Sequence, residues 1–371
     1  MSDPTTIAIA PGSIPHRPEL PRSVSPILII GTGGIVKDAH LPAYRMAGFP
    51  VWGLYNRTRE RAEALAREYG IAQVFDNLDA ALAAAPAGVI FDLALPASLF
   101  AETLRKLPRG AHVLIQKPMG ESLAQAREVL GVCRERGLHA AINCQLRFSP
   151  FVMAARHLIQ MGAIGHLVDM EMRLTVMTPW GLFPFLNGLP RVEMVYHSVH
   201  YIDLFRSFLG EPRTVHARTS AHPAHPDLAS VSSSIILDYP DPLRATITTN
   251  HMHRFGAKHQ ESYLKWEGTR GAIKARVGLL MDYPRGAGDT FEYCQLDEHN
   301  QPGEWIAEKL QGSWFPDAFV GSMAQVQRHK EGSLAKMTTD VEDVIHTMEV
   351  VEAAYASSER GGVKPSEFTR P

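Results

Sequence analysis

The feature that most constrains the fold is a regular alternation of short apolar runs and helix-forming stretches between residues 26 and 146. The apolar runs lie at 27–30, 51–55, 89–93, 112–115 and 139–144. The helix-compatible stretches lie between them, at 37–46, 58–69, 98–106 and 123–135. Strands that alternate with helices form a parallel sheet with right-handed crossovers and helices on both faces. The sequence therefore predicts a doubly wound α/β domain over residues 26–146.

The pattern changes beyond Pro150. One helix is predicted at 151–161, and strands follow at 167–175, 231–237, 243–249, 263–267 and 271–276. A last helix is predicted at 341–355. Successive strands with few helices between them favour an open, mainly antiparallel sheet, so residues 147–371 are expected to form an α+β domain. Residues 1–25 carry several prolines and no sustained periodicity, which favours a flexible or extended arm.

Composition narrows the class of protein. The 37 Lys and Arg residues nearly balance the 39 Asp and Glu residues, and no block of like charge suggests a nucleic-acid partner. No segment approaches the roughly 20 apolar residues of a membrane span. The three cysteines, Cys133, Cys144 and Cys294, form no CxxC pair. We therefore expect a cytoplasmic protein whose partners are neither nucleic acid nor membrane.

A glycine loop, Gly31-Thr32-Gly33-Gly34-Ile35-Val36, directly follows the first predicted strand and precedes a helix. The first glycine permits a tight turn, and the second lets the backbone approach a pyrophosphate at the helix N-terminus. Val36 stands where a third glycine or an alanine is usual. This context predicts a Rossmann-type domain that binds a nicotinamide dinucleotide, with residues 31–35 contacting the cofactor.

The end of the second strand leaves the choice of cofactor open. The stretch Tyr55-Asn56-Arg57-Thr58 has no carboxylate to bind a ribose 2′-hydroxyl. Arg57 could pair with the 2′-phosphate of NADP, whereas Asn56 could bond the free hydroxyl of NAD. Both cofactors therefore remain compatible with these residues.

Four further segments carry a family resemblance. They are Gln116-Lys117-Pro118, NCQLRFSP at 143–150, SVHYIDLFRSFLG at 198–210 and VVEAAYASSERGG at 350–362. Together with the glycine loop, they resemble the Gfo/Idh/MocA family of sugar and inositol dehydrogenases. The resemblance implies a second domain that binds substrate and forms a homodimer or homotetramer. It favours NAD, because sugar-catabolic relatives commonly use it.

The resemblance also implies roles for single residues. The family triplet is typically Glu-Lys-Pro, and its lysine contacts the substrate hydroxyl and the cofactor; Lys117 matches, and Gln116 departs. The second signature, Asp-x-Gly-x-His-x-x-Asp, appears as residues 196–203. His200 and Asp203 match it, whereas Tyr196 and Ser198 replace the first Asp and the Gly.

Either His200 or Tyr196 could take the hydroxyl proton. The ordinary pKa of histidine, about 6.5, suits a base at neutral pH. The ordinary pKa of tyrosine, about 10, suits one only if a cation such as Lys117 lowers it. Further cofactor contacts are expected from Leu95, Pro96, Gln116, Lys117 and Asn143. Further substrate contacts are expected from Arg147, Phe148, Trp180 and His197, although Arg147 could instead link the domains and Trp180 could lie in an interface.

Three histidine pairs have a spacing that could chelate a metal: His197 with His200, His251 with His253, and His222 with His225. No third ligand is fixed by spacing, and hydride transfer needs no metal, so we predict none. The resulting hypothesis is an NAD(P)-dependent dehydrogenase that oxidises an aldose to a lactone, with D-apiose the leading nominee, or a related polyol. The alternatives are an NADPH-dependent reductase of a keto or dicarbonyl sugar, a catalytically inactive dinucleotide-binding sensor or scaffold, and a metal-dependent isomerase.

Overall fold

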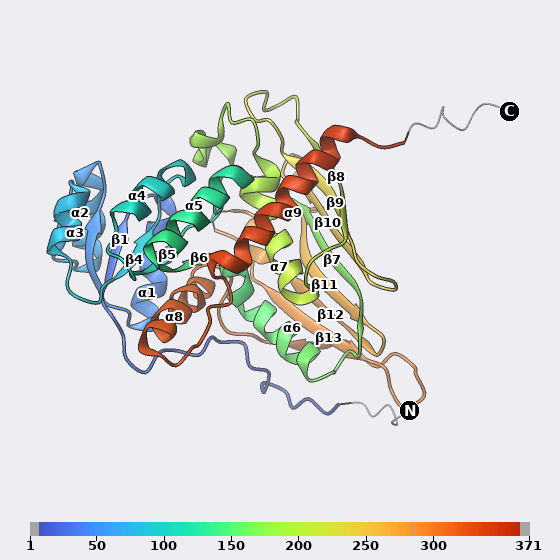
Figure 1. Ribbon diagram of the computed structural model, residues 1–371. Coiled ribbons are helices and arrows are strands. Elements are labelled where there is room, and N and C mark those ends of the chain that lie inside the picture. Colours follow the sequence, from blue (N-terminus) through green and yellow to red (C-terminus); the bar gives the residue numbers. More distant parts are fainter. Residues whose placement is uncertain (1–6, 284, 364–371) are drawn as a thin grey trace.

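The computed structural model describes residues 7–283 and 285–363 and contains two large sheets (Figure 1). The first sheet is parallel, with strand order β3-β2-β1-β4-β5-β6. Its strands are β1 Ile27–Ile30, β2 Val51–Tyr55, β3 Gln73–Phe75, β4 Ile90–Leu93, β5 His112–Ile115 and β6 His139–Ile142. The order reverses between β1 and β4, and at such a switch point the carboxyl ends of the strands leave room for a ligand.

Helices cover both faces of this sheet. Their bounds are α1 Leu41–Ala47, α2 Arg59–Tyr69, α3 Leu78–Ala84, α4 Phe100–Lys106 and α5 Leu123–Arg136. Alternate residues of β1 face opposite sides, as the period of a strand requires. Leu28 and Ile30 pack in a core that includes α4 and α5, whereas Ile27 and Ile29 pack in a second core that includes α1 and α2.

The second sheet has the order β14-β13-β12-β11-β7-β10-β9-β8. Its strands are β7 Leu167–Thr175, β8 Thr214–Ser220, β9 Ser232–Asp238, β10 Arg244–Asn250, β11 Glu261–Gly268, β12 Gly271–Arg276, β13 Thr290–Gln295 and β14 Ile306–Glu308. Only β7 and β10 pair in parallel among these strands. The sheet is thus mainly antiparallel, and the predicted combination of an α/β and an α+β domain is confirmed.

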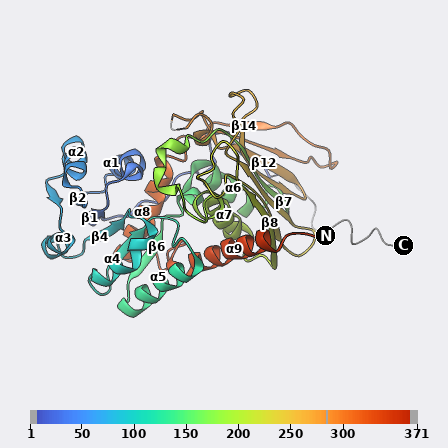
Figure 2. The same cartoon turned by 90° about the horizontal axis from the view of Figure 1, so that it is seen from above.

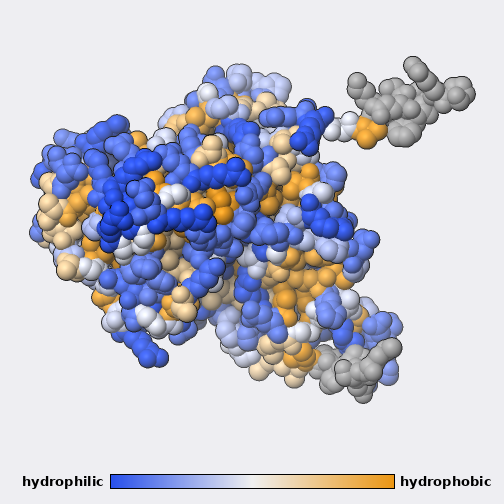
Figure 3. Space-filling view, viewed as in Figure 1, coloured by the Kyte–Doolittle hydropathy of each residue, from blue (hydrophilic) through white to orange (hydrophobic). Residues whose placement is uncertain are grey.

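Helices α6 Pro150–Gln160, α7 Val199–Leu209 and α9 Val341–Arg360 lie between the two sheets and along the second one (Figures 1 and 2). Buried residues of α6, α7 and α9 belong to the same core as α4 and α5, so one apolar core spans both domains. Hydrophilic residues cover most of the face shown in Figure 3, with smaller apolar areas between them. Among the described residues, no helix is long and apolar enough to cross a membrane.

Several elements differ from the sequence-based expectation. Strands β3, β8, β13 and β14 and helix α3 were not expected, because they are short or carry polar residues on exposed faces. Helix α8, Asp317–Glu331, was not expected either. It lies in the chain beyond the predicted boundary at residue 146, yet its buried Phe319 and Met323 pack in the core beneath α1 and α2. The C-terminal part of the chain therefore returns to complete the first domain.

The N-terminal arm, for which a flexible or extended course was expected, runs from β14 to α8 along the chain's own surface in the part that the structure describes. The carboxylate of Glu331 accepts hydrogen bonds from the backbone of Arg22 and Ser23. The side chain of Gln327 bonds to both backbone groups of Ser25. Nearer the start of the arm, the backbone N–H of Gly12 donates to Glu308 of β14. The arm is thus held against the chain's own surface, since side chains of α8 and β14 satisfy part of its backbone.

Candidate active site

The glycine loop lies where β1 and β4 end side by side. Gly31 has a φ of +102°, and a Cβ at this position would collide with the carbonyl oxygen of Ala94 in the loop after β4. Only glycine tolerates both conditions. At Gly33, by contrast, no atom lies within 4 Å of the position that a Cβ would take. The backbone at Gly33 therefore faces open space, as the approach of a pyrophosphate requires.

Unpaired polar atoms at this edge fit a bound dinucleotide. Thr32 follows β1 and Asn143 follows β6, and both are buried. The hydroxyl of Thr32 and the amide oxygen of Asn143 have no hydrogen-bond partner among the described residues. Buried polar atoms without partners are costly, and a polar ligand at the carboxyl ends of these strands would satisfy them.

At the end of β2, the side chain of Asn56 is engaged in hydrogen bonds, whereas, among the described residues, that of Arg57 is not. Asn56 Oδ1 accepts a hydrogen bond from the backbone N–H of Thr32 at 3.2 Å, and Asn56 Nδ2 donates to the carbonyl of Thr58 at 2.8 Å. Asn56 therefore holds the glycine loop against β2. Arg57 is exposed, and no hydrogen bond or ion pair engages it within the described ranges, so its guanidinium is free to bind an anion.

A buried network that the sequence analysis did not identify lies beneath the cofactor edge. His40 Nδ1 lies 2.7 Å from Asp92 Oδ2, and the hydroxyl of Tyr44 donates to the same oxygen at 2.7 Å. Both His40 and Asp92 are completely buried. A carboxylate can only accept hydrogen bonds, so it fixes the proton of His40 on Nδ1 and leaves Nε2 as an acceptor.

This network reaches Lys117 through Gln116. The amide nitrogens of Gln116 and Asn143 each lie 3.4 Å from His40 Nε2, which makes both of them donors. Gln116 Oε1 in turn accepts the backbone N–H of Lys117 at 2.8 Å. The pair His40–Asp92 thus orients Gln116, and Gln116 orients the backbone of the lysine.

Lys117 follows β5 at the same edge as the glycine loop. Its Nζ donates to the backbone carbonyl of Tyr196 at 2.8 Å. Burial disfavours the charged ammonium and lowers the pKa of Lys117 to about 8. At neutral pH the group is therefore a cation whose remaining N–H donors are free to polarise a substrate oxygen.

His200 and His197 lie close enough to Lys117 to be affected by its charge. Burial first, and then the Lys117 ammonium, hold the pKa of His200 well below its ordinary value. Burial and the neighbouring His251 likewise lower the pKa of His197. Both imidazoles are therefore neutral at pH 7 and weaker bases than an ordinary histidine, which differs from the expectation of a pKa near 6.5 for His200. The ring of His200 packs edge-on against Trp314, with 5.3 Å between the centroids.

Tyr196 is not arranged as a base. Its hydroxyl donates to Glu121 Oε1 at 2.9 Å, and burial together with this carboxylate raises the pKa of Tyr196 above its ordinary value. The expectation that Lys117 could lower this pKa is not met, because the ammonium contacts the backbone carbonyl of Tyr196 and not its hydroxyl. The tyrosine therefore positions the lysine through its main chain.

Two of the expected substrate contacts are engaged elsewhere. Arg147 forms a two-pronged ion pair with Asp203, at 2.7 and 2.6 Å, and also bonds to Asp343 and to the carbonyl of Thr338. All three of its guanidinium nitrogens are occupied by partners that, like Arg147, lie within residues 147–371, so it belongs to an ion-pair network inside the second domain and does not form the domain link named above as the alternative. The ring of Phe148 packs against Gly321 of α8, where a Cβ would collide with it.

Trp180 and His197 belong to a second buried polar group behind the lysine. The Trp180 ring lies 5.4 Å from the His197 ring and 5.6 Å from the His251 ring, and its indole N–H has no partner among the described residues. Completely buried Glu193 lies 3.4 Å from His251 Nε2. Although burial opposes its charge, the neighbouring His251 and hydrogen bonds from Ser233 and Ser198 lower the pKa of Glu193. The sequence analysis did not identify Glu193. The signal that could have found it is a carboxylate three residues before the histidine-containing segment 196–200.

The fold and this edge define a class of protein, a nicotinamide-dependent oxidoreductase acting on CH–OH groups. Two family models match the chain. One describes an oxidoreductase family with an NAD-binding Rossmann fold and matches residues 26–144. The other describes the GFO/IDH/MocA C-terminal domain and matches residues 152–274. The chain belongs to the Gfo/Idh/MocA family, as its motifs predicted.

Two curated relatives align with this chain over most of its length and most of their own. D-xylose 1-dehydrogenase (NADP(+)) 2 of Haloferax volcanii is 24% identical over 90% of this chain and 97% of its own. D-apiose dehydrogenase of Paraburkholderia graminis is 23% identical over 90% of this chain and 87% of its own. The solved structure of aldose-aldose oxidoreductase from Caulobacter crescentus with glycerol has the same fold, with a TM-score of 0.75, 18% identity and coverage of 92% and 99%.

Proposed function

We propose that this protein oxidises a hydroxyl of a sugar, converting an aldose to its lactone, with D-apiose the leading nominee. The observation that carries the proposal is the meeting of Lys117, His200 and the glycine loop at one edge. The two relatives that span 90% of the chain are named as dehydrogenases of D-xylose and D-apiose, which supports a small aldose as substrate.

The chemistry divides between two side chains. Lys117 donates a hydrogen bond to the substrate oxygen and stabilises the negative charge that develops there. Neutral His200 accepts the hydroxyl proton as the carbon–oxygen double bond forms. The hydrogen on the same carbon leaves with its electron pair, and a bound nicotinamide ring supplies the acceptor for that hydride. Asp92, His40 and Gln116 act only by holding the lysine in place.

We infer that NADP is the better cofactor, although the family resemblance favoured NAD. Arg57 offers an exposed guanidinium without a partner among the described residues, and a guanidinium is well suited to bind a phosphate. Asn56 already uses its oxygen and one N–H on the backbone, which weakens its expected role toward a free 2′-hydroxyl. Residues 55–58, at the end of β2, include no carboxylate that would repel the phosphate.

The test is reduction of NADP and NAD across a panel of aldoses and polyols, followed at the nicotinamide absorbance. Wild type is compared with Lys117→Met and with Lys106→Met, which changes an exposed lysine on α4. We expect turnover of an aldose by wild type and Lys106→Met and its loss in Lys117→Met. Cofactor binding without oxidation would contradict the proposal and direct the assay to reduction of keto and dicarbonyl sugars. Cofactor binding without turnover in either the oxidation or the reduction assay would favour a catalytically inactive sensor.

A further inference from the structure

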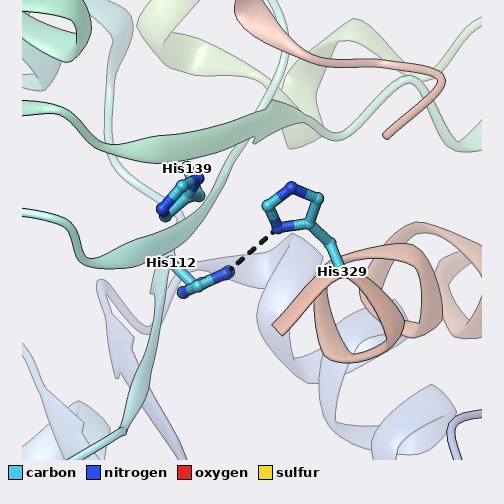
Figure 4. Close-up of side chains that lie close together, drawn as sticks. All are labelled: His112, His139 and His329. Atoms are coloured by element: carbon cyan, nitrogen blue, oxygen red, sulfur yellow. Dashed lines mark hydrogen bonds between the residues drawn. The ribbon is translucent and has the colours of Figure 1, made fainter. Parts of the chain in front are cut away.

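Three histidines meet at the edge of the first sheet opposite the glycine loop (Figure 4). His112 and His139 are the first residues of β5 and β6 and are partners in register. His329 comes from the last turn of α8. One ligand nitrogen from each ring can be chosen so that the three lie within 4.8 Å of one another.

Their geometry is close to that of a metal site. His112 Nε2 and His329 Nδ1 are 3.1 Å apart. Zinc binds imidazole nitrogen at about 2.0–2.1 Å in a tetrahedral site, so two such ligands lie about 3.4 Å apart. The ring centroids are separated by 4.5, 5.2 and 5.0 Å, so small side-chain rotations bring the third nitrogen within reach.

The three rings also have the chemistry of ligands. No carboxylate forms a hydrogen bond or ion pair with any of them in the part of the chain that the structure describes. Burial, and then the other two histidines and Lys330, lower the pKa of His112 to about 4, so its lone pair is available at neutral pH. Neutral imidazole is a preferred ligand of zinc and its neighbours in the periodic table.

We propose that His112, His139 and His329 bind a divalent zinc ion, with water completing the tetrahedron. The site is structural, because His112 begins β5 whereas Lys117 follows the opposite end of the same strand. Binding ties α8 to the two strands. The same helix holds the N-terminal arm through Gln327 and Glu331, so the metal also fixes the support of that arm.

The experiment measures zinc binding to the metal-stripped full-length protein by competition with a chromophoric chelator. Wild type is compared with His329→Asn, His139→Asn and the control His299→Asn, whose exposed ring pairs with adjacent Glu298. We expect one tight equivalent in wild type and control. Loss of one ligand should weaken binding by more than the roughly 10- to 100-fold that a lost outer partner costs.

A second readout separates binding from misfolding. Zinc should raise the melting temperature of wild type and of His299→Asn by several degrees and leave both ligand variants unchanged, because binding to the folded state stabilises it. If His329→Asn fails to fold, the zinc affinity of His139→Asn tests the proposal. His139 is exposed, so its replacement leaves the core intact. Equal zinc affinity in wild type and the folded ligand variants, or no binding by wild type, would overturn the proposal.

Discussion

Replacing Lys117 by methionine removes a cation whose charge acts on His200 at the cofactor edge. The Lys117 ammonium uses one N–H on the carbonyl of Tyr196 and keeps the others for the substrate oxygen. Loss of a single donor to a developing oxyanion typically costs 2.7–4 kcal/mol, or about 10²–10³ in kcat. We expect a loss of this size in kcat/KM for Lys117→Met.

The dependence of wild-type kcat/KM on pH tests the same role of the Lys117 ammonium. With a pKa of about 8, roughly one tenth of the molecules keep the Lys117 ammonium at pH 9, whereas an ordinary lysine is almost fully charged there. The value of kcat/KM should therefore fall about tenfold per pH unit above pH 8. His200 is already neutral at pH 7, so no rise is expected between pH 7 and 8.

Stability provides the control. The folded-state pKa of Lys117 lies below its unfolded value of 10.5, so the charged lysine opposes folding below pH 8, and stability rises as the pH passes from 8 toward 10.5. Lys117→Met should accordingly be at least as stable as wild type at pH 7 in a thermal melt. A flat wild-type profile from pH 7 to 10, or the same alkaline fall in Lys117→Met, would refute the assignment.

Three further variants test the neighbouring groups. His200→Asn should lower kcat by about 10²–10⁴. Tyr196→Phe should keep a kcat within tenfold of wild type and lose about 1–3 kcal/mol of folding stability. If steady-state assays show the larger loss of kcat in Tyr196→Phe, the tyrosine is the base. Arg57→Ala should raise KM for NADP roughly tenfold and leave KM for NAD nearly unchanged. Arg61→Ala, on α2, is the control. Equal effects of Arg57→Ala on both cofactors would show that Arg57 does not bind the 2′-phosphate. Gln116→Glu should move the alkaline fall of kcat/KM to higher pH, and an unmoved profile would show that this side chain does not set the charge of Lys117.

The sequence predicted the elements that depend on local pattern. Strands β1, β2 and β5 and helices α2 and α5 match the expected ranges to within a residue, because their apolar periodicity and flanking turns are strong. Helix α8 carries glycine, small and polar residues at its buried positions, so its sequence shows little of the face that it presents to the first domain.

The groups that connect distant segments were missed for a different reason. His40 and Asp92 lie 52 positions apart, and His112 and His329 lie 217 apart, so no spacing rule joins them. A local signal did exist for the first pair. Asp92 interrupts an apolar strand, and a buried carboxylate requires hydrogen-bond donors. His40 and Tyr44 are four residues apart on the helix that packs against that strand, and so present both donors on one face.

Gln116 shows why a departure from the family triplet need not signal lost catalysis. Its amide nitrogen donates to His40 Nε2, whereas a glutamate carboxylate there could only accept and would require a second proton on His40. Its oxygen still accepts the N–H of Lys117, so the lysine keeps its position. A glutamate would also place a negative charge beside the ammonium and favour the charged form. Glutamine retains the geometry without that charge, and burial can then lower the pKa of Lys117 to about 8.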